Sequence, residues 1–125
     1  MTARIVVADD EADIRRLVSF TLRRRGYTVL EASAGDAALD LIRRERPDLC
    51  VLDVMMPGLT GTEVAKALTG DPATAGIPII MLSAKGQAVE IELGLESGAR
   101  AYLVKPFSPA ALATQVADIL AAKAG

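Results

Sequence analysis

Short, mostly apolar segments alternate with segments of helical periodicity along the 125-residue sequence, and this alternation most restricts the fold. A short apolar run is typical of a strand buried on both faces, whereas apolar residues spaced three and four apart are typical of a helix with one buried face. Buried strands alternating with amphipathic helices predict an α/β fold with a parallel sheet and right-handed crossovers. The predicted strands are residues 5–8, 27–32, 49–52, 77–82 and 101–104.

Five helices are predicted from the apolar spacing between and after these strands. Their apolar faces fall within residues 14–22, 38–42, 64–68, 86–97 and 112–120. The segment 86–97 is the weakest, because Gly94 in its interior is about 1 kcal/mol less favourable in a helix than alanine. The sequence contains no internal repeat, low-complexity segment or linker, so we expect residues 1–125 to form one domain.

The composition argues against several classes of function. A net charge of −2 and an aromatic content of 3% argue against direct binding of nucleic acid. The chain has no histidine, which excludes histidine-based catalysis or metal binding by its own side chains. The single cysteine, Cys50, lies in an apolar run and cannot form an internal disulfide, which suits a reducing cytoplasm. No apolar stretch is long enough to span a bilayer, so we expect a cytoplasmic protein without membrane association.

Charged or hydroxyl-bearing residues stand where four of the predicted strands end. Asp9 and Asp10 follow the first strand, Asp53 the third, Ser83 the fourth and Lys105 the fifth. The carboxyl ends of parallel strands lie along one edge of a sheet, which is where open α/β sheets bind ligands. We therefore expect these five side chains to converge at one site.

Three carboxylates close together repel one another, and a hard divalent cation among them relieves that repulsion. Mg²⁺ prefers oxygen ligands and is often held by one or two carboxylates together with a phosphate. A lysine supplies a positive charge for a phosphoryl oxygen, and a serine supplies a hydroxyl donor. The set as a whole predicts phosphoryl transfer to a carboxylate nucleophile.

Each of these residues also has a simpler interpretation when taken alone. Asp9 and Asp10 would favour the N-terminus of the following helix, and Asp53 would suit a turn before Pro57 and Gly58. An isolated serine at a strand end is usually a turn or cap residue, and an isolated lysine is usually solvated. It is their joint placement at four strand ends that favours a site.

The sequence resembles the receiver domains of two-component response regulators, of the chemotaxis-regulator type, over its whole length. The matching motifs are Val-Ala-Asp-Asp-Glu at 7–11, Leu-Asp-Val-Met-Met-Pro-Gly at 52–58, Met-Leu-Ser-Ala-Lys at 81–85 and Tyr-Leu-Val-Lys-Pro-Phe at 102–107. The resemblance implies a doubly wound, flavodoxin-like, five-stranded sheet in the order 2-1-3-4-5. It also implies a phosphoacceptor switch that assists its own phosphorylation and dephosphorylation, rather than an enzyme.

The resemblance assigns roles around the acidic cluster. Asp53 resembles the aspartate that accepts a phosphoryl group from a kinase phosphohistidine. Asp10, Asp53 and the backbone carbonyl of Met55 resemble the Mg²⁺ ligands, with Asp9 acting through water. By the same resemblance, Met55 and Lys85 are the loop residues best placed to orient a hydrolytic water.

The remaining roles concern the switch. Ser83 resembles the hydroxyl that turns toward the phosphoryl group, Lys105 the lysine that pairs with it, and Tyr102 the aromatic residue that moves with Ser83. Ala84 is small enough to leave room for the phosphoryl group, and the Lys105–Pro106 bond is expected to be cis. Residues 86–104, beside the last helix, are expected to carry the signal onward.

The implied partners are a sensor histidine kinase or histidine phosphotransfer protein, and a downstream effector protein or fused output domain. DNA-binding relatives often carry two acidic residues where this chain has Arg100 and Ala101, and this departure weakens the case for their particular paired homodimer.

Four alternative functions fit the sequence less well. A flavodoxin would need a phosphate-binding loop free of acids after the first strand, and a nucleotide-binding enzyme would need a Gly-rich loop. An aspartyl phosphatase would need a cap domain. A phosphorylation-independent interaction module of the same fold remains the strongest alternative, although it would be expected to have lost some of the five residues at the strand ends.

Overall fold

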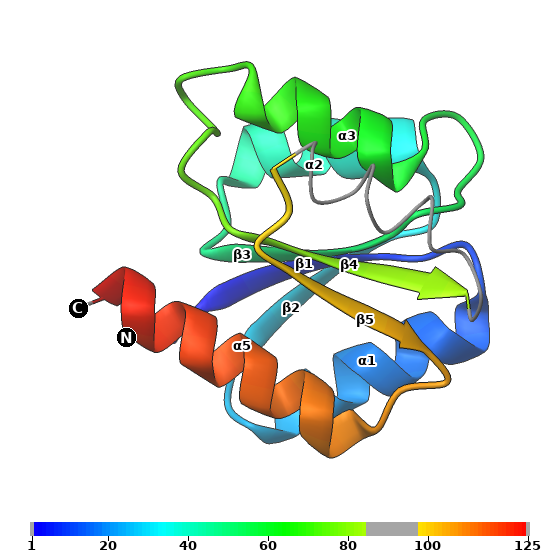
Figure 1. Ribbon diagram of the computed structural model, residues 1–125, viewed down its shortest axis with the longest axis vertical. Coiled ribbons are helices and arrows are strands. Elements are labelled where there is room, and N and C mark those ends of the chain that lie inside the picture. The colour runs from blue at the N-terminus through cyan, green and yellow to red at the C-terminus, as the bar shows by residue number, and fades with distance from the viewer. Residues whose placement is uncertain (1, 85–97, 125) are drawn as a thin grey trace.

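The computed structural model describes residues 2–84 and 98–124 and shows a five-stranded parallel sheet between two layers of helices (Figure 1). The strands are β1 (Arg4–Ala8), β2 (Thr28–Ala32), β3 (Leu49–Asp53), β4 (Ile79–Ala84) and β5 (Ala101–Lys105). Their order in the sheet is β2-β1-β3-β4-β5, and every neighbouring pair is parallel. The predicted fold class and strand order are confirmed.

The described helices are α1 (Ala12–Arg24), α2 (Gly35–Glu45), α3 (Gly61–Thr69) and α5 (Pro109–Ala124). Helices α2 and α3 cover one face of the sheet, and α1 and α5 cover the other (Figure 1). The helix predicted at 86–97, Gly94 within it, and Lys85 lie outside the described residues.

The core is divided by the sheet into two apolar clusters, and strand alternation assigns side chains to each. On β1, Ile5 and Val7 pack with residues of α1 and α5, whereas Val6 and Ala8 pack with residues of α2 and α3. Successive side chains of a strand point to opposite faces, so a strand covered on both sides must be apolar at every position. This explains why the central strands read as continuous apolar runs.

Strands β3, β4 and β5 end later than the sequence predicted, and β2 and β4 start later. Asp53 is the last residue of β3, where it pairs in register with Leu82, and Lys105 is the last residue of β5. Strand β4 begins at Ile79 rather than at 77, because Pro78 has no amide hydrogen to donate to a ladder. Its carbonyl still accepts a bond from the Cys50 amide at 3.0 Å.

The loop between β3 and α3 is held by two backbone hydrogen bonds, one between its ends and one from α2 to its middle. The Gly61 amide donates to the Val54 carbonyl at 2.8 Å, and the Gly35 amide donates to the Pro57 carbonyl at 3.0 Å. A Cβ at Gly61 would collide with the carbonyl oxygen of Asp53. Glycine at this position therefore lets α3 start directly against the end of β3.

A capping box begins α3. The Thr60 hydroxyl accepts from the Glu63 amide at 3.1 Å, and the Glu63 carboxylate accepts from the Thr60 amide at 3.0 Å. This pair satisfies two amides that the helix itself leaves free. The hydrogen bonds that the Glu63 carboxylate accepts at Thr60 also lower its pKa. The loop that leaves Asp53 is thus held by backbone and side-chain bonds together.

We predict that Gly61→Ala destabilises the fold, because the new Cβ would meet the Asp53 carbonyl oxygen and force the two backbones apart. The expected loss in the free energy of unfolding is about 1–3 kcal/mol, the usual range for overpacking. Urea denaturation of the purified chain measures it. Gly76→Ala is the matched control, since nothing lies within 4 Å of a Cβ there. Equal stabilities of the two variants would contradict the role given to Gly61.

Candidate functional site

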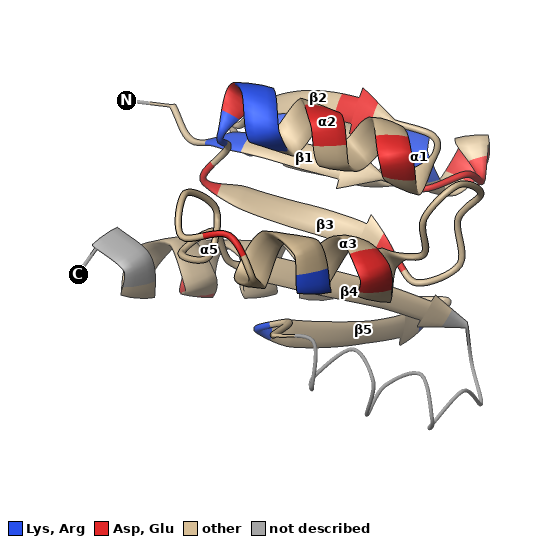
Figure 2. Ribbon diagram, turned by 90° about the horizontal axis from the view of Figure 1, so that it is seen from above, with Lys and Arg blue, Asp and Glu red and all other residues tan. Residues whose placement is uncertain are grey.

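Lys105 lies at the centre of a group of carboxylates where β1, β3 and β5 end. Its Nζ lies 3.1 Å from Asp9 Oδ2, 3.3 Å from Asp53 Oδ1 and 3.0 Å from Glu11 Oε1. The acidic residues that follow β1 and end β3 are seen at the arrowhead ends of those strands in Figure 2. The parallel topology thus brings together residues from three separate parts of the chain.

Asp9 is fully buried, and its surroundings satisfy one carboxylate oxygen but not the other. Asp9 Oδ1 accepts from the Glu11 amide at 2.9 Å. Asp9 Oδ2 accepts no hydrogen bond from any described residue and is met only by the ion pair with Lys105. A buried carboxylate oxygen without a hydrogen-bond donor is stabilised by a nearby cation. Asp9 Oδ2 could therefore interact with a second cation besides Lys105.

Asp53 is also buried, with 4% of its surface exposed. Burial and the neighbouring charge of Asp9 raise its pKa to about 7, against the opposing effect of Lys105. For Lys105, burial lowers the pKa, but the carboxylates of Glu11, Asp53 and Asp9 outweigh burial and raise it above its ordinary value. The lysine therefore stays charged, while the two buried carboxylates repel each other across it.

The cluster fits a hard divalent cation. Asp9, Asp10, Glu11 and Asp53 each offer a carboxylate oxygen, and these oxygens lie within 4.8 Å of one another. Oxygen ligands in this number suit Mg²⁺ or Ca²⁺ rather than a softer metal. The unsatisfied Oδ2 of Asp9 supports the same reading, because a cation there would stabilise a buried charge.

The remaining predicted residues lie close to this cluster. Ser83 is buried on β4, one residue beyond the register partner of Asp53, and pairs with Val104 of β5. Tyr102 is partly buried and packs with the α2 and α3 side of the core, as does Met81, its register partner on β4. Since side chains alternate along a strand, Ser83 shares that face with Met81, and hence with Tyr102.

Two predicted features lie in or beside the loops at this edge. Met55 lies two residues beyond Asp53, and 55% of its surface is exposed. The peptide bond between Lys105 and Pro106 is cis, which confirms that prediction. Ala84 ends β4, but its side chain lies outside the described residues. The roles given to Ser83, Ala84, Tyr102 and Met55 remain predictions.

Glu11 is a member of the cluster to which sequence reasoning gave no role. It ends a run of three acids after β1, and its longer side chain reaches Lys105. The run itself was visible in the sequence. The sequence did not show which of the three acids would lie next to Lys105, because that depends on where the end of β5 lies relative to the turn after β1.

A family model of the response regulator receiver domain matches residues 5–117. The chain belongs to the response-regulator receiver family. It is 46% identical over 120 residues to the alkaline phosphatase synthesis transcriptional regulatory protein PhoP of Bacillus subtilis, covering 96% of the chain and 49% of that protein. It is 42% identical over 116 residues to the DNA-binding response regulator MtrA of Mycobacterium tuberculosis strain H37Rv, covering 93% and 50%.

The receiver fold is equally clear in a solved relative. The chemotaxis response regulator CheY4 of Vibrio cholerae superposes with a TM-score of 0.88 at 34% identity, covering 95% of this chain and 99% of that one. The chain spans about half the length of the curated relatives above. As a receiver domain of two-component systems, it is a phosphoacceptor switch rather than an enzyme.

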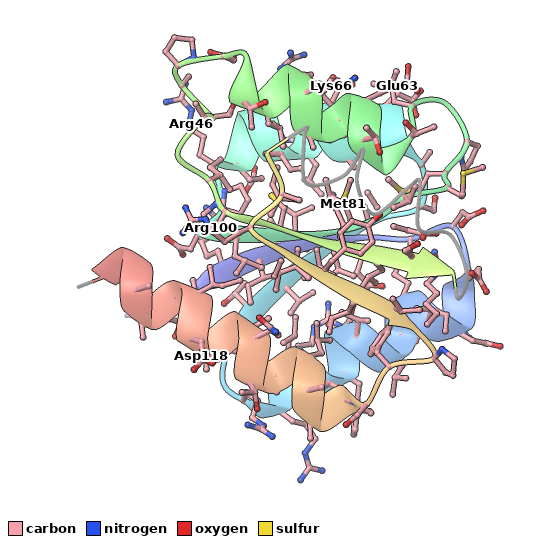
Figure 3. The ribbon with its side chains drawn as sticks, viewed as in Figure 1. Arg46, Glu63, Lys66, Met81, Arg100 and Asp118 are labelled. Atoms are coloured by element: carbon pink, nitrogen blue, oxygen red, sulfur yellow. The ribbon has the colours of Figure 1, made fainter. Side chains whose placement is uncertain are left out.

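The end of the sheet away from the acidic cluster carries Arg100. Arg100, labelled in Figure 3, precedes β5 and so lies at the sheet edge opposite the acidic cluster. Its amide donates to the Ile79 carbonyl at 2.7 Å, at the start of β4. Among the described residues, no helix has both the length and the apolar character needed to cross a membrane.

We predict that Asp53 makes metal-free stability fall as pH rises. Its pKa of about 7, raised from 3.8 by burial and by Asp9, means that the folded chain holds this proton more tightly than the unfolded chain. The free energy of unfolding should therefore decrease between about pH 4 and pH 7 and level off above. Asp53→Asn should remove this slope and be more stable than the native chain at about pH 8, by about 1 kcal/mol or more.

Urea denaturation at a series of pH values, in chelator-treated buffer, measures this difference. Asp40→Asn is the control, because Asp40 is an exposed acid on α2 away from the cluster. Parallel stability curves for the native chain and Asp53→Asn would contradict a raised pKa at Asp53.

Proposed function

We propose that Asp53 accepts a phosphoryl group from a histidine kinase or histidine phosphotransfer protein, with Mg²⁺ bound at the acidic cluster. The observation that carries this proposal is the contact of Lys105 with both Asp9 and Asp53 at the carboxyl end of the sheet. Family membership supports it, since the chain is a receiver domain and Asp53 resembles the acceptor aspartate of that family. The cytoplasm is the compartment where such a donor would be met.

The transfer itself needs few groups. A carboxylate oxygen of Asp53 attacks phosphorus, an O–P bond forms, and the bond from phosphorus to the donor imidazole nitrogen breaks. The electron pair of that bond stays on the nitrogen, which then takes a proton from solvent. Asp53 must be ionised to attack, so its raised pKa favours reaction above about pH 7 unless a cation lowers it.

The other residues supply positive charge and position. Asp10, Asp53 and the Met55 carbonyl would hold Mg²⁺ directly and Asp9 through water, and the bound ion would neutralise charge on the phosphoryl oxygens. Lys105 would pair with a phosphoryl oxygen of the product, and its raised pKa keeps it positively charged for this task. Glu11 holds the same ammonium at 3.0 Å, so it competes with the phosphoryl group for Lys105.

The output is proposed to begin at Ser83. A hydroxyl that turns toward the phosphoryl group leaves space on the face that Ser83 shares with Tyr102, and the ring can follow into it. A local charge change would thereby bias a two-state element, as switches require. The partner on this side is an effector protein or an output domain, and we assign no direct nucleic-acid contact to this domain.

We predict that the chain is labelled at Asp53 by a small acyl phosphate in the presence of Mg²⁺. Intact-mass and peptide mass spectrometry should find one added phosphoryl group, on the peptide that contains Asp53. The label should be lost in Asp53→Asn and when Mg²⁺ is chelated, and retained in the control Asp40→Asn. Labelling that survives Asp53→Asn, or that needs no metal, would reject the proposal and favour a phosphorylation-independent interaction module.

We predict that the phosphorylated chain decays slowly and that Met55→Asn accelerates its decay. Hydrolysis needs a water aligned on phosphorus, and the exposed Met55 side chain has no hydrogen-bond donor with which to align one. An asparagine amide supplies a donor and an acceptor, so an increase of about threefold or more in the decay rate is expected. Met55→Leu is the matched control, and equal decay in all three chains would refute the role of this position.

A further inference from the structure

Arg15 connects the acidic cluster to β2, the outermost strand on one side of the sheet. It lies on the first turns of α1, and its side chain is 20% exposed. Its Nη1 donates to the backbone carbonyl of Asp9 at 2.8 Å, and its Nε lies 3.3 Å from Glu31 Oε1 on β2. One guanidinium thus binds both the end of β1 and the edge strand beside it.

The bond from Arg15 completes the fixation of Asp9. The Asp9 amide donates to the Ala32 carbonyl at 3.1 Å, and Asp9 Oδ1 accepts from the Glu11 amide at 2.9 Å. With its carbonyl also held by Arg15, Asp9 is bonded through amide, carbonyl and side chain. The backbone leaves the sheet at this carbonyl to place Asp10 and Glu11 in the cluster. The position of their carboxylates therefore depends on this bond.

Glu31 holds the other side of the guanidinium. Its second oxygen lies 3.3 Å from Arg23 Nη2, and Arg23 also donates to the Val29 carbonyl at 3.1 Å. Arg15 and Glu31 line a cavity of about 710 Å³ over β2 and α2, outside the acidic cluster. Solvent and salt reach this ion pair and weaken it, whereas the Asp9 carbonyl lies on a fully buried residue.

We propose that Arg15 is a positioning residue for the metal site, which fixes the turn after β1 so that the carboxylates of Asp9 and Asp10 are arranged for Mg²⁺ before it binds. This inference rests on the proposed function, because it assumes that the acidic cluster binds Mg²⁺. A charged donor to a carbonyl is a strong hydrogen bond, and ligands arranged in advance need less ordering when the ion arrives. Glu31 acts one step further away, by orienting Arg15.

The test is a Mg²⁺ titration of the full chain without any phosphoryl donor, followed by the amide NMR signals of Asp10 and Glu11. Arg15→Met should weaken Mg²⁺ binding about fivefold or more, as expected for the loss of a charged hydrogen bond. Arg15→Lys, which keeps the charge and can still donate to the Asp9 carbonyl, should restore part of the affinity. Glu31→Gln should have a smaller effect, and one that shrinks as salt is added.

Arg16→Met is the matched control, since Arg16 is the next residue on α1, carries the same charge and is exposed. Thermal melts of the metal-free variants separate affinity from stability, because a purely structural role would lower the melting temperature without changing the Mg²⁺ affinity of the folded chain. Equal affinities for Arg15→Met and Arg16→Met would overturn the role of Arg15 and leave the proposed function standing. No Mg²⁺-dependent shifts in the native chain would overturn both.

Discussion

The ion pairs of Lys105 with the buried carboxylates of Asp9 and Asp53 are the interaction on which the site depends. One ammonium faces two buried carboxylates and the more exposed Glu11, so negative charge exceeds positive charge where water is scarce. Burial, together with the charge of Asp9, raises the pKa of Asp53 to about 7, and one oxygen of Asp9 accepts no hydrogen bond from the described residues. The same imbalance destabilises the metal-free chain and favours binding of a divalent cation, whose charge would then offset that of a phosphoryl group.

The rest of the fold keeps these charges together. Strands β1, β3 and β5 are not adjacent in sequence, and only the parallel order of the sheet brings their ends to one edge. Gly61 lets α3 begin against the carbonyl of Asp53, and the capping box at Thr60 fixes that start. Arg15 gives the turn after β1 a comparable anchor. These contacts hold the backbone on both sides of the cluster in place.

Much of this arrangement could be predicted from the sequence, because the information is local. The apolar runs defined five strands, and the residues after them defined Asp9, Asp53, Ser83 and Lys105 as neighbours, while the strand order came from the receiver motifs. What depends on side-chain length and direction could not be predicted. The reach of Glu11 to Lys105, the carbonyl bond of Arg15, and the place of Asp53 inside β3 rather than beyond it follow from the three-dimensional packing.

The most direct measurement is a crystal structure of the chain with Mg²⁺ and a metal fluoride that mimics a phosphoryl group. The phosphoacceptor assignment predicts the mimic bonded to a carboxylate oxygen of Asp53, with Lys105 Nζ within hydrogen-bond distance of a fluorine. It also predicts Mg²⁺ at about 2.1 Å from oxygens of Asp10 and Asp53. A mimic bound to another carboxylate, or a cation that leaves Asp53 uncoordinated while Lys105 stays on Glu11, would contradict it.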